Sequence, residues 1–124
     1  MKMLAWQIER LPLADGGEHA RMYIGNVVRM QEEIGTGGAG FRFLYASFLQ
    51  ELAAKTGYAA LDGLAARLVE IGDRWREFAL AAARMIRGRD TLSPAVLAGR
   101  LRALAADERL FFQSLHRAQR AWAR

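Results

Sequence analysis

The sequence predicts an all-α fold, a compact bundle of about five helices that ends in two long antiparallel helices. Alanine, leucine and arginine, which all favour helix, dominate the 124 residues, and the chain contains only two prolines. Apolar residues recur every three to four positions over long stretches, as on the buried face of a helix. No segment alternates apolar and polar residues for long enough to predict a strand.

The first two helices are expected at residues 2–11 and 18–34. The first ends before Pro12, and a turn with two glycines at residues 15–17 separates it from the second. The second helix carries an apolar face at helical spacing. This face comprises Tyr23, Ile24, Val27, Val28 and Ile34.

A glycine-rich run at residues 35–40 separates the second helix from the third. Its four glycines end one helix and open the next, because each glycine costs roughly 1 kcal/mol inside a helix. The run leaves backbone N–H groups uncovered at the start of a helix, which suits an anion or an acyl oxygen. A very close helix–helix contact is the commoner use of such a run, and both interpretations stay open.

The third helix is expected at residues 41–56 and the fourth at residues 61–86. Gly57 follows the third helix and is well suited to the position after a helix C-terminus. The fourth helix has the longest uninterrupted apolar seam, and its Gly72 predicts close approach by another helix. The apolar positions are Phe41, Leu44, Tyr45, Phe48 and Leu52 in the third helix, and Leu61, Leu64, Leu68, Ile71, Trp75, Phe78 and Ala82 in the fourth.

The fifth helix is expected to start at Ser93 and Pro94, with serine as the N-cap and proline in the first helical position. Its apolar stripe comprises Leu97, Leu101, Leu104, Phe111 and Leu115, interrupted by Glu108. The whole chain is expected to form one helical domain, because it shows no internal repeat or low-complexity linker.

Glu108 and Arg42 are the two charges that most require partners. A carboxylate on an apolar face must be paired, protonated or next to a cavity, since burying an unpaired charge costs several kcal/mol. We expect a salt bridge to Arg42 or Arg74, with a functional role for Glu108 left open. Arg42 lies in the first turn of its helix, where a cation opposes the dipole, so it too predicts a carboxylate partner, Glu33 or Glu108.

Composition argues against several classes of function. The chain has no cysteine, which rules out a disulfide, a thiolate metal site or a cysteine nucleophile within it. His19 and His116 lack metal-ligand spacing, and no Ser/His/Asp set is indicated, so no catalytic residue, metal or cofactor is predicted. The net charge is +5, but no nucleic-acid-binding signature accompanies it, and nucleic acid is not an expected partner. Without a signal peptide or a membrane span, a soluble cytoplasmic protein is expected.

Three phrases of the sequence resemble a known family. They are the glycine-rich phrase at residues 33–42 with the segment that follows it to Leu49, the phrase at residues 71–75, and Glu108 with Phe111 and Phe112. Together they resemble the C-terminal helical domain (DUF4872) of the butirosin biosynthesis protein H-like family. The likeness covers about residues 22–116, and the glycine-rich phrase is its most specific part.

This resemblance implies an activity for a complete two-domain protein. In that family, a papain-like N-terminal domain supplies a nucleophilic cysteine, and an acyl group passes from a carrier protein to an aminoglycoside amine in bacterial secondary metabolism. The present chain resembles only the C-terminal part, so it is expected to be a fragment, a split subunit or a freestanding descendant. We expect it to be non-catalytic alone and to act as an acyltransferase only with a cysteine-bearing partner domain.

The expected role is to shape a groove for a substrate or a carrier protein. The residues assigned to this groove are Glu33, Thr36, Gly37, Gly38, Arg42, Tyr45, Asp73 and Glu108. The basic balance of the chain suits an acidic acyl carrier protein, whereas a cationic aminoglycoside would prefer carboxylates such as Glu32, Glu33, Asp73 and Glu108. The alternative is a structural helical module that self-associates, because the chain has more aromatic residues than so small a bundle is expected to bury.

Overall fold

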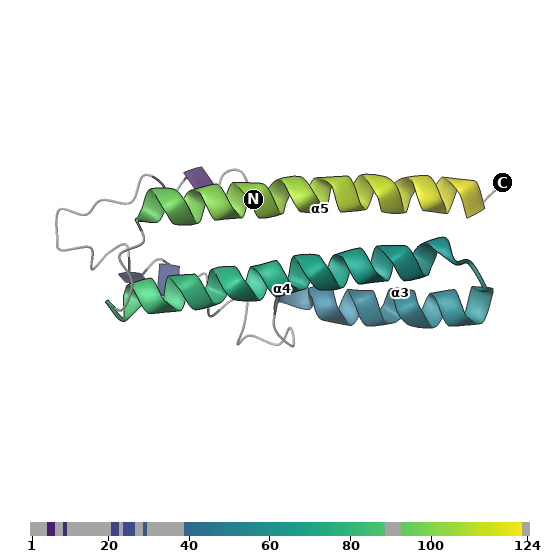
Figure 1. The fold of residues 1–124 in the computed structure, drawn as a ribbon, viewed down its shortest axis with the longest axis horizontal. Coiled ribbons are helices and arrows are strands. Elements are labelled where there is room, and N and C mark those ends of the chain that lie inside the picture. Colours follow the sequence, from purple (N-terminus) through teal and green to yellow (C-terminus); the bar gives the residue numbers. More distant parts are fainter. Residues whose placement is uncertain are drawn as a thin grey trace.

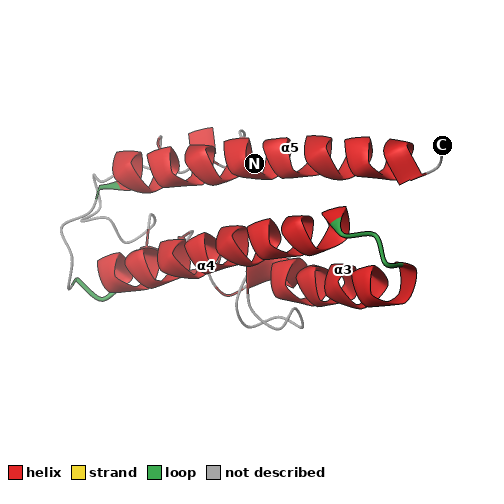
Figure 2. Cartoon of the chain, turned by 45° about the vertical axis from the view of Figure 1, so that its right-hand side comes forward, coloured by secondary structure: helices red, strands yellow, loops and turns green. Residues whose placement is uncertain are grey.

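The structure, a computed structural model, is a bundle of antiparallel helices. It describes Ala5, Trp6, Glu9, Arg21, Met22, residues 24–26, Arg29, and residues 39–88 and 93–122. Its elements are a short left-handed turn η1 (Ala39–Phe41), α3 (Arg42–Thr56), α4 (Ala60–Ile86) and α5 (Pro94–Trp122). Both views place α4 in the middle, with α3 beside its first half and α5 along its other side (Figures 1 and 2). The all-α prediction and the two long antiparallel C-terminal helices are confirmed.

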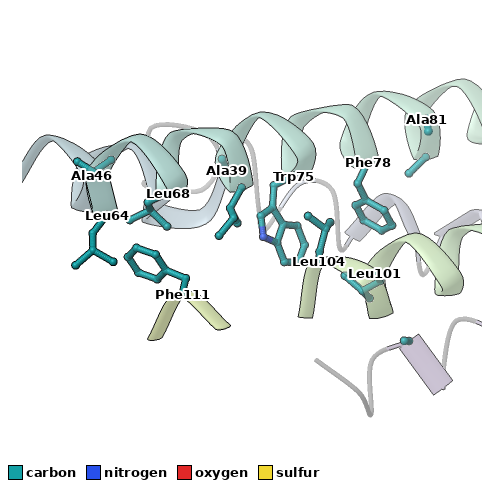
Figure 3. Close-up of a cluster of buried hydrophobic side chains, with 14 of the residues drawn as sticks. Ala39, Ala46, Leu64, Leu68, Trp75, Phe78, Ala81, Leu101, Leu104 and Phe111 are labelled. Carbon is teal, nitrogen blue, oxygen red and sulfur yellow. The ribbon is translucent and has the colours of Figure 1, made fainter. Parts of the chain in front are cut away.

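The apolar seam of α4 forms the centre of the core, as its spacing predicted. All seven residues of the predicted seam are buried. Trp75 and Phe78 project from α4 toward Leu101 and Leu104 of α5, and Phe111 of α5 packs near Leu64 and Leu68 (Figure 3). Four of the five apolar positions predicted for α5 are also buried, and Leu115 is half-buried.

Of the five residues in the apolar stripe predicted for α3, four are exposed and only Leu52 packs against the core. Phe41, Leu44, Tyr45 and Phe48 are 38–65% exposed. The buried residues of α3 are instead Ala46, Leu49 and Ala53. Two of these three residues are alanines, which let α3 lie close to α4.

Gly72 of α4 lies directly against the Phe43 side chain of α3. A Cβ atom added at Gly72 would lie 2.6 Å from Cε1 of Phe43 and 3.0 Å from two further atoms of that ring. The absence of a side chain therefore creates the space that the Phe43 ring fills. The sequence predicted this close approach, although it did not identify Phe43 as the neighbour.

The ends of the helices follow the predicted local signals. Gly57 ends α3 in a left-handed conformation (φ 72°), and its N–H donates to the carbonyl oxygen of Ala53 at 2.8 Å. Ser93 Oγ accepts a hydrogen bond from the N–H of Val96 at 3.3 Å, so Ser93 caps α5 and Pro94 takes its first position.

The first two predicted helices lie mostly outside the described residues. Those of their residues that are described are helical, and two contacts place them against α4 and α5. Glu9 forms an ion pair with Arg102, and Gly25 lies beside Ile86. Both contacts are in the half of the bundle where α4 ends and α5 begins. No helix within the described residues has the length and apolar character needed to cross a bilayer.

Tyr58 joins the α3–α4 turn to the end of α5. Its hydroxyl donates to the carbonyl oxygen of Ala118 at 3.2 Å, and its ring lies 4.9 Å from that of Trp122. Tyr58→Phe is expected to reduce the free energy of unfolding by about 1 kcal/mol, because it removes the hydrogen bond and keeps the ring contact. Urea titration followed by circular dichroism measures this loss. An unchanged midpoint would show that the hydrogen bond adds nothing to stability.

Candidate functional site

Three of the residues that the sequence assigned to a groove line one hollow in the structure. Arg42 and Tyr45 come from α3 and Glu108 comes from α5, although 66 positions separate Arg42 from Glu108 in the chain. The hollow has a volume of about 450 Å³. Its lining consists of Gly40, Phe41, Arg42, Tyr45, Leu68, Glu108 and Phe112.

Arg42, Glu108 and Trp75 form a single polar cluster at the end of this hollow. Arg42 Nε donates to Glu108 Oε1 at 2.5 Å, and the indole Nε1 of Trp75 donates to the same oxygen at 2.8 Å. The guanidinium carbon of Arg42 lies 4.2 Å from the centre of the Trp75 ring, within range of a cation–π interaction. The two charged side chains are only 20% and 15% exposed. The predicted partner of Arg42 is therefore Glu108, and the carboxylate on the α5 apolar face is paired.

The same arginine stabilises an unusual turn in front of α3. Ala39, Gly40 and Phe41 all have positive φ angles of 50°, 54° and 72°. This region costs a residue with a Cβ atom roughly 1–2 kcal/mol. Arg42 Nη1 donates to the carbonyl oxygens of Ala39 at 3.2 Å and Gly40 at 3.1 Å. These bonds and the Glu108 pair explain how a cation is accommodated at a helix N-terminus.

A second hollow continues along the same side of α4, toward the end of α5. It has a volume of about 320 Å³, and Tyr45 lines both hollows. Most of its lining is apolar, with residues from α3, α4 and α5. These residues are Tyr45, Phe48, Leu49, Leu52, Thr56, Tyr58, Leu61, Leu115, Ala118, Gln119 and Trp122. We call the two hollows together the α3–α5 groove.

Of the other predicted groove residues, only Asp73 is among the described residues. Asp73 is exposed on α4 and lies outside the lining of both hollows. Glu33, Thr36, Gly37 and Gly38 lie outside the described residues, as does Glu32. Arg74, the alternative partner considered for Glu108, pairs instead with Asp107.

Gly40, Phe41, Leu68 and Phe112 of the first hollow, and Trp75 of the polar cluster, were not assigned to the site from the sequence. Trp75 has the spacing of a core residue and is buried, but its indole N–H also completes the Glu108 cluster. Phe112 is 54% exposed and lines the first hollow beside the predicted residues. A second aromatic directly after the core residue Phe111 was the available signal, because adjacent helical positions cannot share one face.

The described polar side chains show no arrangement typical of nucleophilic catalysis. Ser47 Oγ donates to the carbonyl oxygen of Phe43, and Ser114 Oγ donates to that of Leu110, each within its own helix. Ser114 Oγ also accepts a hydrogen bond from Arg67. Among the described residues, no group of three or more histidine and acidic side chains could hold a metal ion.

The family comparison extends over most of the chain. A family model described as "Domain of unknown function (DUF4872)" matches residues 1–115. The chain belongs to the DUF4872 family. No curated protein and no solved structure matches it. For this DUF4872 chain, the match includes α3, α4 and most of α5, and therefore both walls and the floor of the first hollow.

Proposed function

We propose that this chain is a non-catalytic recognition domain of a butirosin biosynthesis protein H-like acyltransferase. In this proposal the α3–α5 groove binds an acyl carrier protein, while a cysteine-bearing partner domain supplies the nucleophile. The chain itself contains no cysteine. Membership of the DUF4872 family supports the assignment to this kind of helical domain.

The observation that carries the proposal is the convergence of α3 and α5 on an open, largely apolar groove. Grooves of this kind between helices are common binding sites for partners and ligands. The Arg42–Glu108 pair lies in the lining of the first hollow and joins its α3 wall to its α5 wall.

The geometry favours a carrier protein over a cationic aminoglycoside as the occupant. Glu108 already accepts hydrogen bonds from Arg42 and Trp75 through one of its oxygens. Its charge is compensated by the guanidinium, so it offers little attraction to a second cation. Asp73, the other described carboxylate assigned to amine recognition, lies outside the groove lining.

A structural module for dimerisation is the second candidate function. The observation that favours it is the outward-facing apolar stripe of α3, which includes Phe41, Leu44 and Phe48. Helices that are apolar on more than one side are usually covered by another element. Self-association through α3 would cover this stripe without any catalytic role.

The purified chain is expected to bind an acylated carrier protein without cleaving its thioester. Thioester cleavage by acyl transfer needs an activated nucleophile, which the proposal places on a separate cysteine-bearing domain. Mass spectrometry of the acyl carrier protein after incubation measures the thioester, and isothermal titration calorimetry measures binding. Thioester loss that a point substitution in this chain abolishes would contradict the proposal, and so would an absence of binding.

A further inference from the structure

The positive charge of the described helices is concentrated at the end of α5. Residues 109–122 contain Arg109, Arg117 and Arg120 but no aspartate or glutamate. By comparison, α4 contains four arginines and four carboxylates, and α3 contains two cations and one carboxylate. With histidine neutral, the last four turns of α5 therefore carry a charge of +3, out of +5 for the entire chain.

These arginines share the solvent side of the helix. At about 100° per residue, Arg109, His116 and Arg120 fall within about 40° of one another, and Arg117 lies about 60° further round. All four are exposed, and the buried Phe111 lies on the opposite side. In both views α5 forms one edge of the described bundle (Figures 1 and 2). We call Arg109, His116, Arg117 and Arg120 the basic face.

The arginines of the basic face have no counter-ion within the described part of the chain. Arg102, earlier on the same side of α5, pairs with Glu9, but no described carboxylate pairs with Arg109, Arg117 or Arg120. Arg117 Nε donates only to the carbonyl oxygen of Gln113, at 3.4 Å within its own helix. Like charges three or four positions apart on a helix repel each other. Carboxylates of a partner placed against this face would therefore be favourable.

The number of charges indicates the class of partner. Three arginines are fewer than the roughly six to ten phosphate contacts that a nucleic-acid complex commonly makes. They are also fewer than the cluster of about four to eight basic residues that binds an anionic membrane. Exposed ion pairs are individually weak, and a few of them suit the rim of a protein–protein contact, where charges chiefly set the association rate.

We propose that the basic face binds carboxylates on the surface of an acidic partner protein. The inference rests on the proposed function, under which this partner is the carrier protein, and it names the surface that the partner's charges contact. Arg109 and Arg120 lie about 60–80° round α5 from Phe112, which lines the first hollow. A protein bound to the basic face therefore also borders the α3–α5 groove.

Surface plasmon resonance with an acidic acyl carrier protein tests the proposal on the full chain, because it measures association and dissociation separately. The α5 variant replaces the three arginines of the basic face (Arg109→Gln, Arg117→Gln, Arg120→Gln). It is expected to lower the association rate constant at least fivefold at 50 mM salt and to change the dissociation rate constant less than twofold. The difference is expected to disappear at 500 mM salt, where exposed charges are screened.

A matched variant of α4 separates the basic face from net charge. The α4 variant replaces three other exposed arginines, by Arg67→Gln, Arg76→Gln and Arg84→Gln. Both variants lower the net charge of the chain from +5 to +2. The α4 variant is expected to keep the association rate constant within twofold of the unmodified chain. Circular dichroism checks that both variants remain helical.

Fluorescence anisotropy with labelled poly-glutamate tests the basic face without a carrier protein. The unmodified chain and the α4 variant are expected to bind this polymer at least fivefold more tightly than the α5 variant at 20 mM salt. An absence of binding, or equal weakening by the two variants, would overturn the inference.

The two probes also distinguish the inference from the proposed function. If the carrier protein binds the unmodified chain and the α5 variant at equal rates, the proposed function stands and the inference fails. If no carrier protein binds but poly-glutamate discriminates between the variants, the proposed function fails and the basic face is a site for another acidic protein. A 20-base-pair DNA duplex that binds more tightly than the carrier protein, through the same arginines, would contradict the proposal and make the face a nucleic-acid site.

Discussion

Glu108→Ala is expected to lower the free energy of unfolding by about 3 kcal/mol and the melting temperature by roughly 10 °C. The substitution leaves the Arg42 guanidinium and the Trp75 indole N–H without their shared acceptor in a site that is mostly buried. Arg42 keeps its hydrogen bonds to the Ala39 and Gly40 carbonyls but loses its counter-ion in a mostly buried site, which costs more free energy than breaking a surface pair. Thermal and urea unfolding followed by circular dichroism measure both quantities.

The neighbouring residue provides a matched control for this substitution. Asp107 pairs with Arg74, whose side chain is 55% exposed, so Asp107→Ala is expected to cost under about 1 kcal/mol. A double-mutant cycle of Arg42→Ala and Glu108→Ala is expected to show coupling of at least 1 kcal/mol. Strictly additive losses would mean that the two residues stabilise the fold independently, against the structure.

Gly72→Ala is expected to destabilise the protein by about 2 kcal/mol, although alanine is the better helix former. The new methyl group would overlap the Phe43 ring, which would have to move together with α3. Gly63 lies in the same helix with nothing within 4 Å of an added Cβ, so Gly63→Ala is expected to stabilise by about 0.5–1 kcal/mol. Urea titration measures both changes in the free energy of unfolding. Opposite signs would show that steric overlap, and not helix propensity, causes the loss at Gly72.

A second substitution identifies the source of the Gly72 effect. Phe43→Leu removes the ring atoms that the methyl group would meet. Combined with Gly72→Ala, it is expected to cost less than the sum of the two single losses. If Gly72→Ala is as stabilising as Gly63→Ala, then α3 and α4 are not in close contact at this point.

The helices were predictable because their signals are local, whereas the side of α3 that packs inward was not. The apolar residues of α4 are spaced so that they can form only one continuous buried face. Ser93 with Pro94 marks the start of α5 to within one residue. In α3, both the exposed stripe and the row that contains Phe43, Ala46, Leu49 and Ala53 could face the core. Gly72 makes room for the Phe43 ring of the inward row, and its position opposite α3 is a tertiary fact that no local pattern contains.

The site was predictable only where electrostatics imposes a requirement. A cation at a helix N-terminus and a carboxylate on an apolar face each need a partner, which led to the Arg42–Glu108 pair. The participation of Trp75 carries no comparable signal, because a buried tryptophan fits the apolar pattern whether or not its N–H is bonded. The left-handed conformations of Ala39 and Phe41 were also missed. Glycine is the usual residue in this conformation, and of the three residues in the turn only Gly40 is a glycine.

The central position of α4 has a consequence for how the chain folds. Among the described helices, the main packing contacts join α3 with α4 and α4 with α5, and each of these pairs is adjacent in sequence. Such contacts require only short loops to close, so little chain entropy is lost before native packing begins. Either helical hairpin can therefore nucleate first, with α4 as the template on which the remaining helix docks. This connectivity is typical of proteins that fold in microseconds to milliseconds.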